Sequence, residues 1–189
     1  AQDVSGRIEA EARISYYSHY DALTDLPNRV LFWDRLTHSI AECRRNGGQF
    51  AVLLLDLDRF AGLNASIGHV NGDRVLLIIT QRLQQSLRDS DTLSRIGGVE
   101  FAIIYQGLEK ETELTHLLTR VLNCFEEPFR EEDFEVFVNA SIGIALFPTV
   151  NFPREEILGN ALKALDHAAF FGPDSTVPFD AVTLNVSGD

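Results

Sequence analysis

Charged side chains gather around a pair of glycines near the middle of the sequence. Arg88, Asp91 and Arg95 precede Gly97-Gly98, and Glu100 follows the pair after Val99. Two glycines between two apolar runs are typical of a β-hairpin turn. Because glycine has no side chain, a phosphate or a metal ion can approach the backbone closely at such a turn. This stretch is therefore a candidate for binding phosphate or metal.

Two further acids follow a strongly apolar run. Residues 50–55 are all apolar, and Asp56 and Asp58 come directly after them, separated by Leu57. A run of this kind is typical of a central strand that is buried on both faces of a sheet. Ligands of open α/β sheets bind at the carboxyl ends of the strands. We therefore expect Asp56 and Asp58 at the edge of a site.

The composition limits the class of ligand. The 189 residues are 45% hydrophobic, enough for one full domain with a core. A net charge of −12 and a pI near 4.8 argue against a nucleic-acid polymer as partner, although a small nucleotide needs only a few local donors. Cys43 and Cys124 are expected to be buried free thiols in a reducing cytosol. No run is apolar enough to span a membrane, so we expect a cytoplasmic fragment without direct membrane contact.

The elements that position these residues alternate between helices and strands. Hydrophobic periodicity predicts helices over residues 4–20, 30–45, 73–87, 109–125 and 153–171. It predicts strands over residues 50–58, 100–105, 134–138, 140–146 and 177–186, with a short strand before the glycine pair. The acidic stretch 126–133 is expected to be a solvated turn. Helices between strands, together with two hairpins, indicate an α/β (α+β) fold with a mixed sheet.

Four motifs occur in a familiar order: Asp21-x-Leu-Thr-x-Leu-x-Asn-Arg29, Asp56-x-Asp-x-Phe60 with Asn64 and Gly68-His-x-x-Gly-Asp73 after it, Arg95-x-Gly-Gly-Val-Glu-Phe101, and Ala140-Ser-Ile-Gly-Ile-Ala145. In order and spacing they resemble the GGDEF (diguanylate cyclase) family over about residues 21–172. The resemblance implies a palm related to nucleotidyl cyclases. Such a palm has a central, mixed but mainly antiparallel sheet of about five strands, flanking helices and a small accessory hairpin. It also implies chemistry that joins two GTP molecules into cyclic di-GMP.

The resemblance divides the chain into three parts. Residues 1–20 are expected to be an N-terminal linker helix, 21–175 the GGDEF domain, and 176–189 a strand or linker toward a following domain. The sequence does not begin with Met, and we expect a longer signalling protein in which an EAL or sensor domain adjoins this one. A homodimer is a further possible partner arrangement.

Part of the family's active site is retained. The resemblance assigns Mg²⁺ to the carboxylates of Asp56 and Glu100 with the carbonyl of Leu57, a reasonable set for a hard cation. The alternative is that both acids are solvated charges at strand ends. The resemblance also assigns guanine binding to Asn64 and Asp73, whose acceptors suit the guanine N1 and N2 hydrogens. Asp73 can alternatively serve as the N-cap of the helix that it begins.

Other positions depart from the family. Val99 stands where the family has the acid to which a catalytic role is given, and an isopropyl group cannot transfer a proton. Ala61 stands after Phe60, where the family has a lysine. Ala169 and Pro173 stand where the closing helix of the family has two cationic residues. Ala65 follows Asn64, at a position that is usually acidic in the family. Loss of the acid alone costs roughly 10²–10⁴-fold in rate.

A second ligand site of the family lies before the glycine pair. Arg88-x-x-Asp91 matches the spacing of its inhibitory product site, and Arg120 lies near where the family contributes a second arginine. The arginine can bind phosphate or a guanine edge through its forked donors. The alternative is a local surface ion pair between Arg88 and Asp91.

Together these residues indicate a catalytically degenerate GGDEF domain that binds cyclic di-GMP at Arg88 and Asp91 as a regulatory ligand. GTP with Mg²⁺ at Asn64 and Asp73 is the alternative ligand. A residual diguanylate cyclase and a ligand-free dimerisation or scaffold module remain as alternative functions. Cyclic di-GMP itself would need no cofactor.

Overall fold

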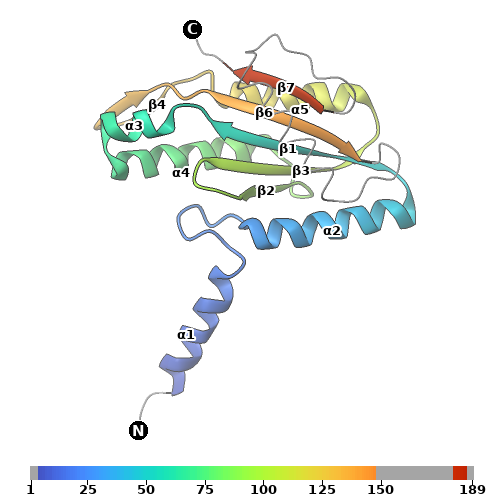
Figure 1. Ribbon diagram of the computed structural model, residues 1–189, viewed down its shortest axis with the longest axis horizontal. Helices are drawn as coiled ribbons and strands as arrows, with labels where there is room; N and C mark the ends of the chain where they lie inside the picture. The colour runs from blue at the N-terminus through green and yellow to red at the C-terminus, as the bar shows by residue number, and fades with distance from the viewer. Residues whose placement is uncertain (1–3, 148–180, 187–189) are drawn as a thin grey trace.

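A five-stranded sheet forms the centre of the computed structural model, which describes residues 4–147 and 181–186 (Figure 1). The strand order is β2-β3-β1-β6-β7, and each neighbouring pair is antiparallel. The strands are β1 (Gln49–Leu57), β2 (Thr92–Arg95), β3 (Glu100–Leu108), β6 (Ala140–Phe147) and β7 (Ala181–Val186). The expected five-stranded, mainly antiparallel sheet is confirmed, and no parallel pair occurs between the described strands.

The central strand β1 owes its position to its apolar sequence. Residues 50–55 are at most 2% exposed because both faces of the strand are covered. Leu53 and Leu55 belong to the larger core cluster, whereas Val52 and Leu54 face the smaller one. Alternation along a strand sends successive side chains to opposite faces. The continuous apolar run therefore predicted this strand correctly.

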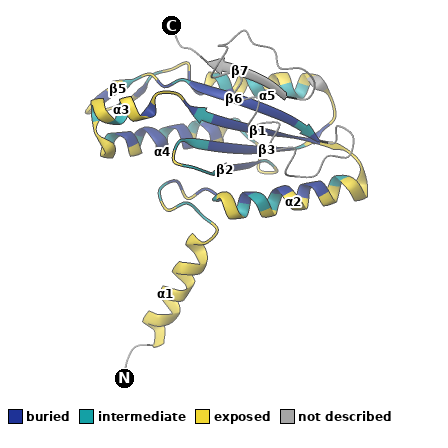
Figure 2. Cartoon of the chain, in the orientation of Figure 1, coloured by how far each residue is buried: buried dark blue, intermediate teal, exposed yellow. Residues whose placement is uncertain are grey.

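Three long helices cover the sheet. α4 (His69–Ser86) and α5 (Glu111–Asn123) supply Val75, Ile79, Leu117 and Val121 to the larger core cluster. α2 (Arg29–Asn46) supplies Phe32, Leu36 and Ile40 to the cluster on the other face. The buried stripes of these helices are visible against their exposed outer faces (Figure 2). The helix predicted over residues 30–45 is confirmed as α2: Asn28 caps its start by accepting a hydrogen bond from the Leu31 amide, and the helix ends at Gly47.

The first helix, α1 (Val4–Tyr17), buries no residue and projects away from the sheet and its helices (Figure 1). Aromatic contacts join its end to the following loop: the Tyr16 ring stacks on Tyr20 with centroids 4.5 Å apart. The Tyr16 hydroxyl donates to the Asp25 carboxylate, and this hydrogen bond raises the pKa of Tyr16 to about 12. Tyr20 also forms a β-bridge with Pro27. The loop is thus attached to the end of α1 by side chains and backbone.

The position of Asp73 corrects one prediction. Asp73 was expected to open a helix, but α4 begins at His69, four residues earlier. Gly68, at φ 85°, ends α3 (Phe60–Ile67) and serves as the N-cap of α4 without a side chain. Because glycine adopts positive φ without strain, one residue both ends the first helix and starts the second. Asp73 therefore lies inside α4 and cannot be its N-cap.

The acidic stretch 126–133 is also more ordered than predicted. β4 (Phe129–Glu131) lies within it and pairs with β5 (Phe134–Val136) as a two-stranded accessory sheet. Phe129 is completely buried, and the Arg82 guanidinium lies 4.1 Å from the centroid of its ring. Arg82 also donates to the carbonyls of Glu127 and Pro128 at 2.8 Å. These contacts anchor a segment whose many acids indicated a solvated turn.

Some predictions fall outside the described residues. They are the helix over 153–171, the replacements Ala169 and Pro173, and the first part of the strand over 177–186. The part of the chain that the structure describes contains no helix with the length and apolarity needed to cross a membrane.

Candidate nucleotide site

The two acids expected to hold a metal lie side by side. Asp56 near the end of β1 is paired in register with Glu100 at the start of β3. Leu57 donates its amide to the Val99 carbonyl at 3.0 Å, which fixes the end of β1 against the glycine turn. Both acids are half-buried. The fold therefore brings together the two predicted carboxylates, which are 44 residues apart in the sequence.

This acidic pair has the donor atoms of a minimal metal site. Within residues 4–147 no group of three or more His, Cys, Asp or Glu side chains is close enough to hold a metal ion. Mg²⁺ prefers six oxygen ligands and is often bound by one or two carboxylates together with substrate phosphates and water. Asp56, Glu100 and the Leu57 carbonyl fit that kind of site, in which the nucleotide completes the coordination.

Gly97 makes room for Glu100. A Cβ atom added at Gly97 would lie 2.9 Å from Glu100 Oε2 and 3.3 Å from its Cβ. The Glu100 backbone carbonyl accepts from the Ile96 amide at 3.0 Å, so the chain turns tightly there. A larger residue at position 97 would therefore have to displace the Glu100 carboxylate from its present place.

Val99 lies in the turn between Gly98 and Glu100. Its half-buried side chain packs against the larger core cluster. An aliphatic side chain there is stabilised by burial, whereas a carboxylate would have to be desolvated. The structure therefore gives Val99 a packing role in the turn.

Arg95 holds the glycine turn to the N-terminal loop, a role that the sequence did not reveal. Its Nε and Nη2 atoms donate to the Gly98 carbonyl at 3.2 and 2.8 Å. Its Nη1 forms an ion pair with Asp21 Oδ2 at 3.0 Å, and its amide donates to the Pro27 carbonyl. The first and third motifs of the sequence therefore form one connected structure.

The guanine-binding candidates lie on the α3–α4 pair. Asn64 packs so closely on α4 that a Cβ added at Gly72 would lie 1.8 Å from Asn64 Oδ1. That oxygen is buried and has no hydrogen-bond partner among the described residues. Asp73, one position after Gly72, is exposed on the surface of α4. A buried acceptor left unpaired costs about 1–3 kcal/mol, so it calls for an explanation.

Arg88 and Asp91 form the local ion pair that the sequence left open as an alternative. Asp91 accepts from the Arg88 amide, Nε and Nη2 at 2.9, 3.3 and 3.0 Å, and from the Gln106 amide at 3.4 Å. The Asp91 side chain is 0% exposed, whereas that of Arg88 is 46% exposed. Asp91 therefore orients Arg88, and only Arg88 presents a surface to solvent.

Further contacts fix the Arg88 guanidinium in place. Its Nη2 donates to the Gln106 carbonyl at 2.6 Å, and its Cζ lies 4.1 Å from the centroid of the Tyr105 ring. A cavity of about 290 Å³ opens beside it. The cavity is lined by the loop Asp25-Leu26-Pro27 and by Arg35, Gln84, Leu87, Arg88, Asp89, Asp91 and Leu93. Arg120 is exposed on the last turn of α5 and does not line this cavity.

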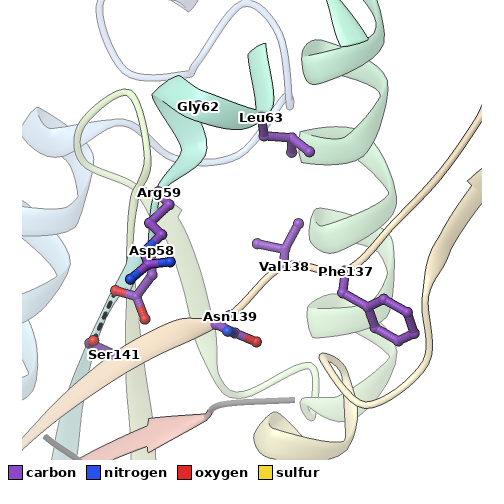
Figure 3. Close-up of a pocket in the computed structure, with 8 residues that line it drawn as sticks. All are labelled: Asp58, Arg59, Gly62, Leu63, Phe137, Val138, Asn139 and Ser141. Atoms are coloured by element: carbon purple, nitrogen blue, oxygen red, sulfur yellow. Dashed lines mark hydrogen bonds between the residues drawn. The ribbon is translucent and has the colours of Figure 1, made fainter. Parts of the chain in front are cut away.

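A larger cavity, of about 710 Å³, lies at the ends of β1 and β6 (Figure 3). Asp58 Oδ1 accepts from the Ser141 hydroxyl at 3.0 Å, and the Asp58 amide donates to the Asn139 carbonyl. Burial raises the pKa of Asp58, although Ser141 and the charge of Arg59 oppose the shift. Gly62, Leu63, Phe137 and Val138 complete the wall. Asp58 thus stands beside a different cavity from Arg88.

The comparisons with known proteins agree with this arrangement. The family model described as diguanylate cyclase, GGDEF domain, matches residues 18–170. A bifunctional diguanylate cyclase/cyclic di-GMP phosphodiesterase, MucR of Pseudomonas aeruginosa, is 38% identical over 149 residues, which are 79% of this chain and 22% of the relative. The chain therefore spans about a fifth of the length of that relative.

Solved GGDEF domains have the same fold. The GGDEF domain of TpbB (YfiN) from P. aeruginosa matches with a TM-score of 0.71 and 33% identity, over 82% of this chain and 88% of that domain. The GGDEF domain of DgcB from Caulobacter crescentus, solved in complex with cyclic di-GMP, matches with a TM-score of 0.74 and 25% identity, over 82% and 91%. With the paired acids, the glycine turn and the sheet order in place, the chain belongs to the GGDEF, or diguanylate cyclase, family.

Proposed function

We propose that this GGDEF domain binds cyclic di-GMP as a regulatory ligand beside Arg88 and does not condense GTP. One observation carries the proposal: the Arg88 guanidinium is fixed by Asp91 and Tyr105 yet remains 46% exposed at the rim of a cavity. Such a preorganised fork suits a phosphate or a guanine edge. The DgcB domain, a solved relative, was crystallised with this nucleotide.

The proposed absence of turnover follows from the active-site side chains. Condensing two GTP molecules requires a 3′-hydroxyl to attack an α-phosphorus, with charge neutralised on the phosphates. Val99 stands where the family has an acid and packs against the core, and Ala61 on the first turn of α3 offers no cation. Without these groups, the rate of GTP condensation would depend on the positioning of the two substrates alone.

Binding of GTP with Mg²⁺ is a second candidate, favoured by one specific observation. Asn64 Oδ1 is buried and unpaired within the described part of the chain, as expected for an acceptor that is satisfied by a ligand. A guanine N–H can supply the donor, and exposed Asp73 can accept from another nitrogen. Mg²⁺, held by Asp56, Glu100 and the Leu57 carbonyl, would neutralise the phosphates.

Regulation would act through a neighbouring domain or a second copy. A ligand that prefers one arrangement shifts the population toward it by its differential affinity. The match to part of a bifunctional cyclase/phosphodiesterase supports an adjacent EAL domain in the full-length protein. We therefore propose a cytoplasmic regulatory module whose ligand state is sensed by its neighbour.

Calorimetry tests the proposal directly. We expect heat with cyclic di-GMP and a Kd that weakens about 10- to 150-fold in Arg88→Ala, because a charge-assisted contact contributes about 1.5–3 kcal/mol. Arg74→Ala is the control, since its exposed pairs with Glu131 and Asp133 lie on another surface.

The other outcomes separate the alternatives. Heat with GTP and Mg²⁺ that is lost in Asn64→Ala would favour the second candidate. No heat with either nucleotide would leave only the scaffold, and a cyclic product formed from GTP and Mg²⁺ would establish a residual cyclase.

A further inference from the structure

The cavity beside Arg88 has a second arginine in its wall. Arg35 lies on α2, and both Arg35 and Arg88 line the same cavity of about 290 Å³. Neither the family motifs nor the charge pattern distinguishes Arg35 from other helix-surface arginines. Only the packing of α2 against β2 and β3 brings it to this cavity.

The two arginines differ in how their donors are used. Arg88 donates to Asp91 and to the Gln106 carbonyl and lies over the Tyr105 ring. Arg35 is half-buried, and its guanidinium forms no hydrogen bond or ion pair with any residue that the structure describes. A guanidinium has five N–H donors, so Arg35 retains all of them for a ligand, whereas Arg88 has fewer to offer.

The charges around the cavity explain what this unpaired cation can do. Asp25, Asp89 and Asp91 also line it, and none of them forms an ion pair with Arg35. If Arg35 were absent, an anionic ligand in the cavity would be repelled by these carboxylates. Only Arg88, which is already paired with Asp91, would attract it. Carboxylates that are not already paired can instead accept from guanine nitrogens.

We propose that Arg35 is a second phosphate-binding side chain of this cavity and that it acts together with Arg88. The proposal rests on the proposed function, because its ligand is cyclic di-GMP. A cavity of about 290 Å³ is just below the usual range of about 300–1,000 Å³ for ligand pockets. It therefore encloses part of the dinucleotide, with one phosphate between the two guanidinium groups.

The geometry favours Arg35 over Arg120 as a residue that determines the binding of cyclic di-GMP. Arg120 is exposed on the last turn of α5 and is absent from the cavity wall. Arg45 lies on the same helix as Arg35, ten residues further on, at about 15 Å along the axis. Arg45 is exposed and outside the cavity, so Arg45→Ala changes the net charge equally without touching the site.

Calorimetry with cyclic di-GMP on the full chain tests the proposal. Arg35→Ala is expected to weaken the Kd about 10- to 150-fold relative to Arg45→Ala, and to reduce its dependence on salt. Arg35→Lys, which keeps the charge but loses the fork, should fall between them. Melting curves should show the same Tm for all three variants within about 2 °C, since surface substitutions change stability little.

Two results would overturn the proposal and they are distinguishable. If the unmodified chain binds cyclic di-GMP but Arg35→Ala binds within twofold of Arg45→Ala, Arg35 has no role while the proposed function stands. If the unmodified chain gives no heat at all with cyclic di-GMP, the proposed function fails and this assignment fails with it.

Discussion

Asp21 Oδ2 lies 3.0 Å from Arg95 Nη1 across 74 positions of sequence. The two side chains are only 23% and 14% exposed, so the pair is largely shielded from water. Asp21 also accepts from the Thr24 amide and hydroxyl at 2.9 and 2.7 Å. This cluster joins the loop after α1 to the glycine turn that carries Glu100.

Removing Arg95 should destabilise the fold more than removing a surface cation. In Arg95→Ala, Asp21 keeps Thr24 but loses its counter-charge, and the Gly98 carbonyl loses both donors. We expect a loss of about 1–3 kcal/mol in the free energy of unfolding, measured by urea titration. Arg74→Ala, which breaks exposed pairs, should cost at most about 1 kcal/mol. Equal losses in both variants would contradict a special role for Arg95.

The same cluster predicts a pH dependence. Burial alone raises the pKa of Asp21, but hydrogen bonds from Thr24 and Arg95 and the charge of Arg95 lower it, and the net pKa is lowered. The charged form therefore stabilises the fold at pH above about 3.9, the unfolded-state value. That contribution is lost as the pH falls through the lower native-state pKa.

Stability curves of the unmodified chain and of Asp21→Asn should consequently differ most near pH 7 and converge in acid. The measurement is the midpoint of urea unfolding between pH 7 and pH 3. A gap between the two chains that stays constant down to pH 3 would show that the carboxylate charge does not contribute.

The sequence predicted the elements whose burial is encoded locally. The apolar run of β1 and the glycines that end α2 at Gly47 each specify an element within a few residues. The accessory strand at Phe129 is different, because its burial depends on Arg82, 47 positions earlier, and its neighbours are mostly acidic. Local pattern cannot indicate a contact of that range.

The candidate site shows the same division. The pairing of Asp56 with Glu100 follows from two motifs that can be read in the sequence. The complete burial of Asp91 under Arg88 and Gln106, and the presence of Arg35 in the same cavity wall, arise only when α2 packs on the sheet. The sequence therefore predicted the Arg88–Asp91 turn as a site, but it did not predict that Arg35 lines the same cavity.

Gly72 and Asn64 should be energetically coupled. In Gly72→Ala the new Cβ would lie 1.8 Å from Asn64 Oδ1, so the asparagine side chain must leave its place. Once Asn64 is replaced by alanine, the same change should stabilise α4 by up to about 1 kcal/mol, because alanine favours a helix over glycine. A double-mutant cycle by urea unfolding measures the coupling. Additive effects would contradict the close contact.

Val99→Asp tests whether the missing acid alone explains the proposed loss of turnover. The new carboxylate would replace a side chain that packs against the core, so we expect a loss of about 1–3 kcal/mol in stability. We also expect no cyclic di-GMP from GTP and Mg²⁺, measured by chromatography, because Ala61 still leaves the phosphates without a cation on α3. Val99→Ala is the control for lost packing without added charge. If Val99→Asp forms cyclic di-GMP at full stability, the missing acid alone explains the loss of turnover. The rest of the site would then position both GTP molecules without the missing cations.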